Sequence, residues 1–136
     1  MAKALGIDYG KKRVGIAISD SLQMIAFALT TIDTPNIFTF LKNFLRAVKI
    51  DCFIVGEPKN LDCTATDSTE MTEKFVEKLS IKHPNIPIKR IDERFTSKIA
   101  KQSILDAGTK KIKRRDKALV DRVSATIILQ SYLDSK

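Results

Sequence analysis

Two short apolar runs near the N-terminus, separated by a polar turn, constrain the fold more than any other feature of this sequence. Residues 4–7 and 14–18 are apolar and rich in β-branched side chains, and the turn between them contains Gly10. This pattern predicts a β-hairpin. Gly6 lies within the first run and Gly15 within the second. A glycine in a strand often allows another group to approach the backbone closely.

Asp8 is the candidate functional residue of this hairpin, because it follows directly after the first apolar run. A carboxylate at the end of a rigid strand can hold a divalent cation or a metal-bound phosphate. An aspartate in a turn also commonly accepts hydrogen bonds from its own loop. The hairpin alone leaves both interpretations open.

The bulk properties indicate one globular domain with a basic surface. The chain has 136 residues, which predicts a single domain over residues 1–136. We expect a cytoplasmic protein, because the sequence has neither a membrane-spanning apolar run nor a stretch of signal-peptide type. The net charge of +8 fits a polyanionic partner. Nucleic acid is favoured over a membrane, since no basic amphipathic helix stands out. Cys52 and Cys63 lack the spacing of metal ligands and are expected to be free thiols.

The remaining elements follow from hydrophobic periodicity. The patterns predict further strands at residues 24–32, 52–55 and 86–91, and helices at residues 35–49, 71–83, 96–107 and 116–133. Thr34 is expected to cap the first helix, with Pro35 at its first position. His83, at a helix end before a proline, is expected to be a capping or surface residue. This order predicts an α/β fold, with a mixed five-stranded sheet and helices on both faces. Three antiparallel strands come first, followed by parallel crossovers.

Acidic residues follow several of the expected strands. Asp8, Glu57 and Glu93 each lie at or just past the C-terminal end of a predicted strand. Ligands of such sheets gather outside the carboxyl ends of the parallel strands. These acids are therefore expected to share one edge of the sheet.

Asp121 is an anomaly in the last predicted helix, because it shares a face with apolar residues such as Ala125 and Ile128. A carboxylate on a core-facing stripe is costly unless it has a partner. One partner would be an arginine such as Arg122, which is a structural solution. The other would be a metal ion held jointly with Asp8.

Acids of this kind suit metal-dependent hydrolysis of a phosphodiester bond. Two-metal sites use carboxylates to hold two cations about 4 Å apart. Oxygen ligands of this type favour Mg²⁺ or Mn²⁺. Arg94 follows Glu93 and could position the phosphate. A basic run between residues 109 and 117 is either a solvated loop or a contact surface for a phosphate backbone. The candidate phosphate-binding residues in this run are Lys110, Lys111, Lys113, Arg114 and Arg115.

Four motifs in order resemble the YqgF/RuvX family, bacterial relatives of RuvC with an RNase H-like fold. They are G-I-D-Y-G-x-K-R-V-G-I-A at residues 6–17, V-G-E-P at 55–58, D-E-R-F-T at 92–96 and D-R-V-S-A at 121–125. The resemblance covers essentially the whole chain. It implies a nuclease that processes the 5′ end of precursor 16S ribosomal RNA. Members of this family have also been described as Holliday junction resolvases.

The resemblance also assigns roles to individual residues. It implies that Asp8, Glu93 and Asp121 are metal-binding catalytic acids. Lys12, Arg13 and Arg94 fall on its basic positions. The chain departs from the family at Glu57, where an apolar residue is common. Because RuvC itself uses a glutamate near the end of that strand, the resemblance makes Glu57 a secondary candidate for a fourth acid, and the alternative is a solvent-facing loop glutamate. The chain departs again at Asp62-Cys63, where Asp-Gly is common, so the turn there is expected to differ.

Three alternatives remain beside a ribosomal RNA nuclease. Sugar kinases and actin-like ATPases share the opening hairpin, but they need two domains that 136 residues do not supply. A non-catalytic RNA-binding factor in ribosome assembly would use the same basic surface. A Holliday junction resolvase would act as a dimer on a symmetric substrate, whereas we expect a monomer or weak dimer. With no tryptophan and two tyrosines, the composition favours backbone recognition over extensive base stacking.

Overall fold

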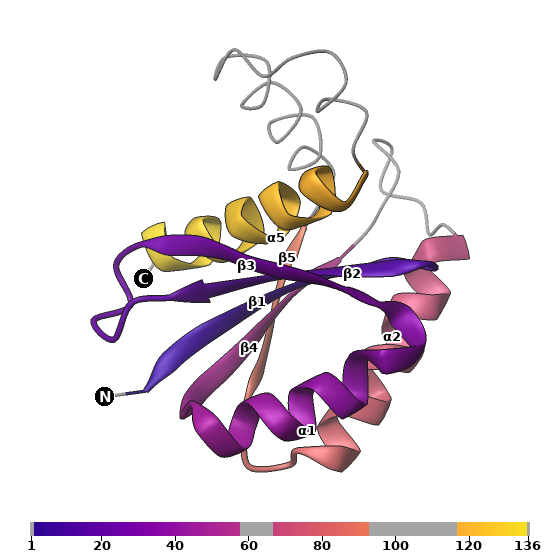
Figure 1. Ribbon diagram of the computed structural model, residues 1–136, viewed down its shortest axis with the longest axis horizontal. Helices are drawn as coiled ribbons and strands as arrows, with labels where there is room; N and C mark the ends of the chain where they lie inside the picture. Colours follow the sequence, from indigo (N-terminus) through magenta and orange to yellow (C-terminus); the bar gives the residue numbers. More distant parts are fainter. Residues whose placement is uncertain (1, 58–66, 93–116, 136) are drawn as a thin grey trace.

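The protein is built on one mixed β-sheet of five strands (Figure 1). The computed structural model describes residues 2–57, 67–92 and 117–135. The strands are β1 (Lys3–Tyr9), β2 (Arg13–Ser19), β3 (Ala26–Asp33), β4 (Ile50–Glu57) and β5 (Ile88–Asp92). Their order across the sheet is β3-β2-β1-β4-β5. Strands β1, β2 and β3 pair antiparallel, while β4 is parallel to both β1 and β5. The predicted sheet is therefore confirmed, including its change from antiparallel to parallel pairing.

Helices cover both faces of this sheet, as expected. Helices α1 (Ile37–Ala47) and α2 (Asp67–Lys82) lie on one face, and α5 (Lys117–Asp134) lies on the other (Figure 1). The helix expected at residues 96–107 lies outside the described residues. No helix in the described part of the chain has both the length and the apolar composition needed to cross a membrane.

Strand β4 separates two cores and shows why its sequence is apolar throughout. Phe53 and Val55 pack with α1 and α2, whereas Cys52 and Ile54 pack with α5. All four side chains are at most 4% exposed. The prediction of a strand buried on both faces is confirmed. Cys52 is buried and forms no disulfide bond, as expected, and Cys63 lies outside the described residues.

The entrance to α1 differs from the prediction. Residues Thr34–Asn36 form a short 3-10 turn, and the α-helix begins only at Ile37. The Thr34 hydroxyl does not act as the expected cap. It donates instead to the carbonyl oxygen of Gly10 at 2.7 Å, and the Thr34 backbone N–H donates to the Lys12 carbonyl. The hydroxyl of Thr34, which was expected to cap the helix, is thus bonded to the hairpin turn instead.

His83 lies at the end of α2, partly buried and edge-on to the Phe53 ring at 6.1 Å between centroids. Burial, and then the positive charge of Lys82, lower the pKa of His83 below its usual value of 6.5. The folded protein therefore favours neutral His83, and the unfolded chain binds more protons once the pH falls below about 6.5.

We expect stability to fall as the pH drops from about 7 to 5.5, and to fall less steeply when His83 is replaced by Gln. Urea denaturation of both proteins across this range measures the difference, because their other titrating groups are the same. Parallel stability curves for the two proteins would contradict the assignment.

Candidate metal centre and nucleic-acid interface

Asp8 lies next to the last residue of β1, on the α5 side of the sheet. Alternate strand residues point to the same face, and Ala4 and Gly6 both lie against α5. Asp8 continues this series and pairs in register with Gly15 of β2. Its side chain is partly buried and has an interaction partner within the protein. The predicted position of Asp8 near the end of the first strand is confirmed, and the residue opposite it in β2 is a glycine.

Gly6 explains how closely α5 approaches β1. A Cβ atom at this position would lie 2.8 Å from the Leu129 Cβ and 3.0 Å from the Ala125 carbonyl oxygen. The first distance is shorter than real Cβ contacts and the second is tighter than most of them, so the helix rests directly on the strand backbone. The group that this glycine admits is therefore a helix of the protein itself.

Helix α5 runs antiparallel to β1. Near its C-terminal end, Gln130 accepts from the Ala26 backbone N–H at 2.9 Å and donates to the Met24 carbonyl. Ala26 is paired with Ser19, whose hydroxyl accepts from the N–H of Ala4 near the start of β1. The second half of α5 thus covers the start of β1, and its first half extends toward the end that carries Asp8.

Asp121 lies in this first half of α5, one turn before Ala125. Ala125 is fully buried against the sheet and contacts the Gly6 backbone region. The fold therefore brings the backbone positions of Asp8 and Asp121 to the same end and the same face of the sheet. The side chain of Asp121 lies outside the part of the structure that is described.

The parallel strands β1, β4 and β5 end at one edge. Ile7 pairs with Val55, and Glu57 pairs with Asp92. Glu93, which follows Asp92 directly, lies outside the described residues. Within β5, Ile91 packs in the α5 core, and the described chain ends at Asp92, at the same edge of the sheet as the end of β1.

Glu57 occupies a different face at this edge. It follows Phe53 and Val55 in the alternation of β4, and both of these pack with α1 and α2. Asp8 follows Ala4 and Gly6, which pack with α5. Strand geometry therefore disfavours Glu57 as a partner of Asp8, and it remains a secondary candidate.

The basic candidates divide into described and undescribed residues. Lys12 is exposed in the β1–β2 turn, and Arg13 begins β2, where it is partly buried. The other basic candidates lie outside the described residues: Arg94, Lys110, Lys111, Lys113, Arg114 and Arg115. Across residues 2–57, 67–92 and 117–135, no three His, Cys, Asp or Glu side chains gather as metal ligands. The acid triad thus stays a prediction.

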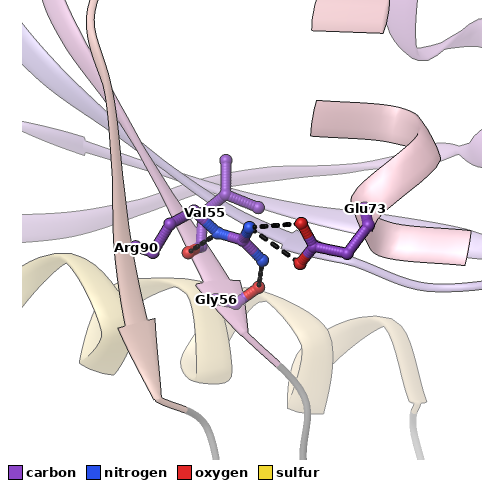
Figure 2. Close-up of polar contacts among 4 residues, drawn as sticks. All are labelled: Val55, Gly56, Glu73 and Arg90. Atoms are coloured by element: carbon purple, nitrogen blue, oxygen red, sulfur yellow. Dashed lines mark hydrogen bonds and ion pairs between the residues drawn. The ribbon is translucent and has the colours of Figure 1, made fainter. Parts of the chain in front are cut away.

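Arg90 supports this edge and was missed in the sequence (Figure 2). Its guanidinium contacts both carboxylate oxygens of Glu73 on α2, at 2.8 and 3.1 Å. It also donates to the carbonyl oxygens of Val55 and Gly56, both at 3.3 Å. Arg90 thereby joins the ends of β4 and β5 to α2. The only signal in the sequence was that Arg90 lies two residues after Ile88 in the strand, so a charged side chain shares the face that Ile88 turns to the core. Nothing in the sequence indicated that its partner is Glu73.

Replacing Arg90 by Met is expected to lower the free energy of unfolding by about 1–3 kcal/mol, because it removes charged donors from several acceptors. Glu73→Gln is expected to cost at most about 1 kcal/mol, since the Glu73 side chain is 49% exposed. Urea denaturation measures both values. Glu70→Gln, in the exposed pair with Lys74, is the control and is expected to change little. Equal effects of all three variants would contradict the role of Arg90.

Comparisons with known proteins agree with this fold and with the expected family. The sequence model of the RuvX family, described as "Holliday junction resolvase", matches residues 2–135. A "Putative pre-16S rRNA nuclease" of Christiangramia forsetii is 50% identical over 133 residues, which cover 98% of each chain. A protein of the same name from Flavobacterium psychrophilum is 48% identical over 136 residues, covering 100% of this chain and 99% of the relative.

Among solved structures, the chain is similar to "T. thermophilus RuvC in complex with Holliday junction substrate". The TM-score is 0.56 at 14% identity, over 94% of this chain and 92% of that chain. At this identity the likeness concerns the fold, and it confirms the RNase H-like architecture that the sequence predicted. With a family match over residues 2–135 and relatives about half identical over their full length, the chain belongs to the RuvX family.

Proposed function

We propose that this protein is a metal-dependent nuclease that processes the 5′ end of precursor 16S ribosomal RNA in the cytoplasm. One observation carries the chemistry: α5 lies directly on β1 at Gly6, so the positions of Asp8 and Asp121 share one end and one face of the sheet. The full-length relatives named for precursor 16S RNA support the substrate.

Asp8, Glu93 and Asp121 are the proposed metal ligands. Carboxylate oxygens are the donors that Mg²⁺ and Mn²⁺ prefer, so this donor set fits the metal. A bound cation would neutralise charge on the scissile phosphate and make a water molecule more acidic. The chain's own carboxylates would orient that assembly, because β1 and α5 are rigid elements. Glu57 is left outside the triad, since the alternation of β4 places it on the other face.

The basic residues would hold the substrate. Lys12 and Arg13 lie at the β1–β2 turn. They directly precede Val14, the residue of β2 that pairs with Tyr9 at the end of β1. We propose that they contact phosphates beside the metal site, together with Arg94 and the cationic residues of 110–115. Contacts of this kind give affinity that falls with salt and that does not depend on sequence.

A second candidate is resolution of four-way DNA junctions, which the description of the matching family favours. A dimer would be needed to present two sites to a symmetric junction. A monomer or weak dimer remains our expectation. A non-catalytic RNA-binding factor is the third possibility, and it would share the basic surface.

Cleavage of three substrates separates these functions. We expect a precursor 16S 5′-leader RNA to be cut faster than an unrelated single-stranded RNA or a four-way DNA junction, in the presence of Mg²⁺ or Mn²⁺. Chelation of the metal should stop the reaction. Faster cutting of the junction would favour the second candidate. Binding of the leader without metal-dependent cutting would favour the assembly factor.

A further inference from the structure

A pocket of about 410 Å³ lies on the face of the sheet opposite Asp8, between the β1–β2 turn and helices α1 and α2. Its size falls within the range of small-ligand sites. Three aromatic rings and three lysines are among its lining residues: Tyr9, Phe38, Phe75, Lys11, Lys74 and Lys78. The functional assignments above use none of these residues.

The aromatic side of the pocket is a packed set of rings. Tyr9 and Phe75 stack with 4.4 Å between centroids and 16° between planes, and Phe38 lies 5.4 Å from Phe75. Phe75 is buried and anchors the set, whereas Tyr9 and Phe38 are only partly buried. Tyr9 and Phe38 therefore present apolar ring surface to the pocket. Although tryptophan is absent and tyrosine is scarce, phenylalanines supply a surface on which a base could stack.

The lysines form a stripe along α2. Lys74, Lys78 and Lys82 follow one another at four-residue intervals, so they lie on one side of the helix over about 12 Å. The ammonium groups of Lys78 and Lys82 each lie 5.3 Å from the centre of the Phe38 ring. Like charges at this spacing destabilise a helix. The Lys74–Glu70 pair is largely exposed and offsets little of that repulsion.

We propose that this pocket binds a nucleotide of the single-stranded substrate, with its base against Tyr9 and Phe38 and its phosphates on the lysine stripe. This inference rests on the proposed nuclease function. Tyr9 directly follows Asp8 in β1, and the two residues point to opposite faces. A strand that crosses the carboxyl edge of the sheet would therefore run from the acid site to the pocket. The stripe extends past the pocket to Lys82, which suits a chain of phosphates better than one free nucleotide.

The phosphate contact is tested with a labelled ten-nucleotide single-stranded RNA and Asp8→Asn protein, which should bind without cutting. We expect Lys78→Gln to lower the slope of log affinity against log salt by about 0.7, the contribution of one phosphate contact on a single strand. Lys49→Gln is the matched control, because Lys49 is an exposed lysine just before β4, at the other end of the sheet. Equal slopes for the two variants would overturn the proposal.

The base contact is tested with Phe38→Leu, which keeps apolar bulk but removes the ring. We expect affinity for the intact RNA to fall by about fivefold or more. A set of RNAs is then used in which a single abasic site occupies each position in turn. At the position whose base contacts Phe38, the parent protein and Phe38→Leu should bind the abasic RNA with equal affinity, because the base is missing for both. Denaturant unfolding checks that the variant is folded. The same loss for every abasic RNA, or no loss with intact RNA, would overturn the base contact.

Competition distinguishes the source of the ligand. We expect a nucleoside monophosphate and a deca-glutamate peptide to displace the RNA only weakly. Displacement by the free nucleotide at the RNA's own affinity would identify a small-molecule site and overturn the proposal, and equal competition by the peptide would indicate unspecific anion binding. Cleavage by Asp8→Asn would refute the proposed chemistry and leave these binding results standing. Unchanged binding by the pocket variants, with Asp8→Asn inactive, would refute the pocket alone.

Discussion

Replacement of Asp8 by Asn is expected to reduce metal-dependent cleavage of the leader RNA by more than about 100-fold, with the fold unchanged. Loss of a residue that only supports a metal ligand typically costs about 10- to 100-fold, so loss of a ligand should cost more. Asn keeps the size of the side chain but removes the negative charge that attracts the cation. The measurement is the initial cleavage rate at saturating Mg²⁺, with urea denaturation as a check on folding.

Asp51→Asn provides the matched control. Asp51 is an exposed aspartate near the start of β4, at the opposite end of the sheet, where it accepts a hydrogen bond from Gln23. It makes the same chemical change away from the proposed metal site, and its rate should stay within a factor of about two of the parent. Similar rates for Asp8→Asn and Asp51→Asn would contradict a catalytic role for Asp8.

Replacement of Gly6 is expected to destabilise the protein by separating α5 from β1. The Cβ of Gly6→Ala would meet the Leu129 Cβ at 2.8 Å and the Ala125 carbonyl oxygen at 3.0 Å. Neither contact can be relieved by rotating a side chain, since one partner is a Cβ and the other is backbone. Helix α5 must therefore move away from β1. We expect Gly6→Ala to lower the free energy of unfolding by about 1–3 kcal/mol, and Gly6→Val to cost more.

Urea denaturation measures these losses, and Ser80→Thr is the control. Ser80 is exposed on α2, so the added methyl group meets solvent, and a change within about 0.5 kcal/mol is expected. Cleavage by Gly6→Ala should also fall at temperatures where the variant is folded, because a displaced α5 moves Asp121 relative to Asp8. A Gly6→Ala protein as stable as the parent would contradict the close packing of α5 on β1.

Local features of the sequence determined most of the fold. The alternation around Gly10 predicted the β1–β2 hairpin, and the unbroken run at residues 52–55 predicted a strand with a core on each side. Such patterns are readable because each strand or helix must bury its own apolar face. The entrance to α1 was predicted incorrectly, since the competing acceptor for Thr34 lies 24 residues earlier, at Gly10.

The candidate site could be predicted only in part, because several of its features depend on contacts between distant segments. The sequence indicated acids at strand ends and an unusual acid in the last helix, because residue type and period are local. It did not indicate that Glu57 and Asp8 lie on opposite faces, which depends on the alternation of two paired strands. Nor did it indicate Arg90, whose partner Glu73 lies on α2.

The sequence by itself thus determined most of the described strands and helices, the basic character of the chain and the acids suited to a metal. Only the tertiary structure decided that α5 runs back along β1 in direct contact with Gly6, and that Tyr9 joins Phe38 and Phe75 beside the lysines of α2. The physical reason is that periodicity reports how each segment meets its own core. Contacts between distant segments depend on how those segments pack together, and no single segment encodes that arrangement.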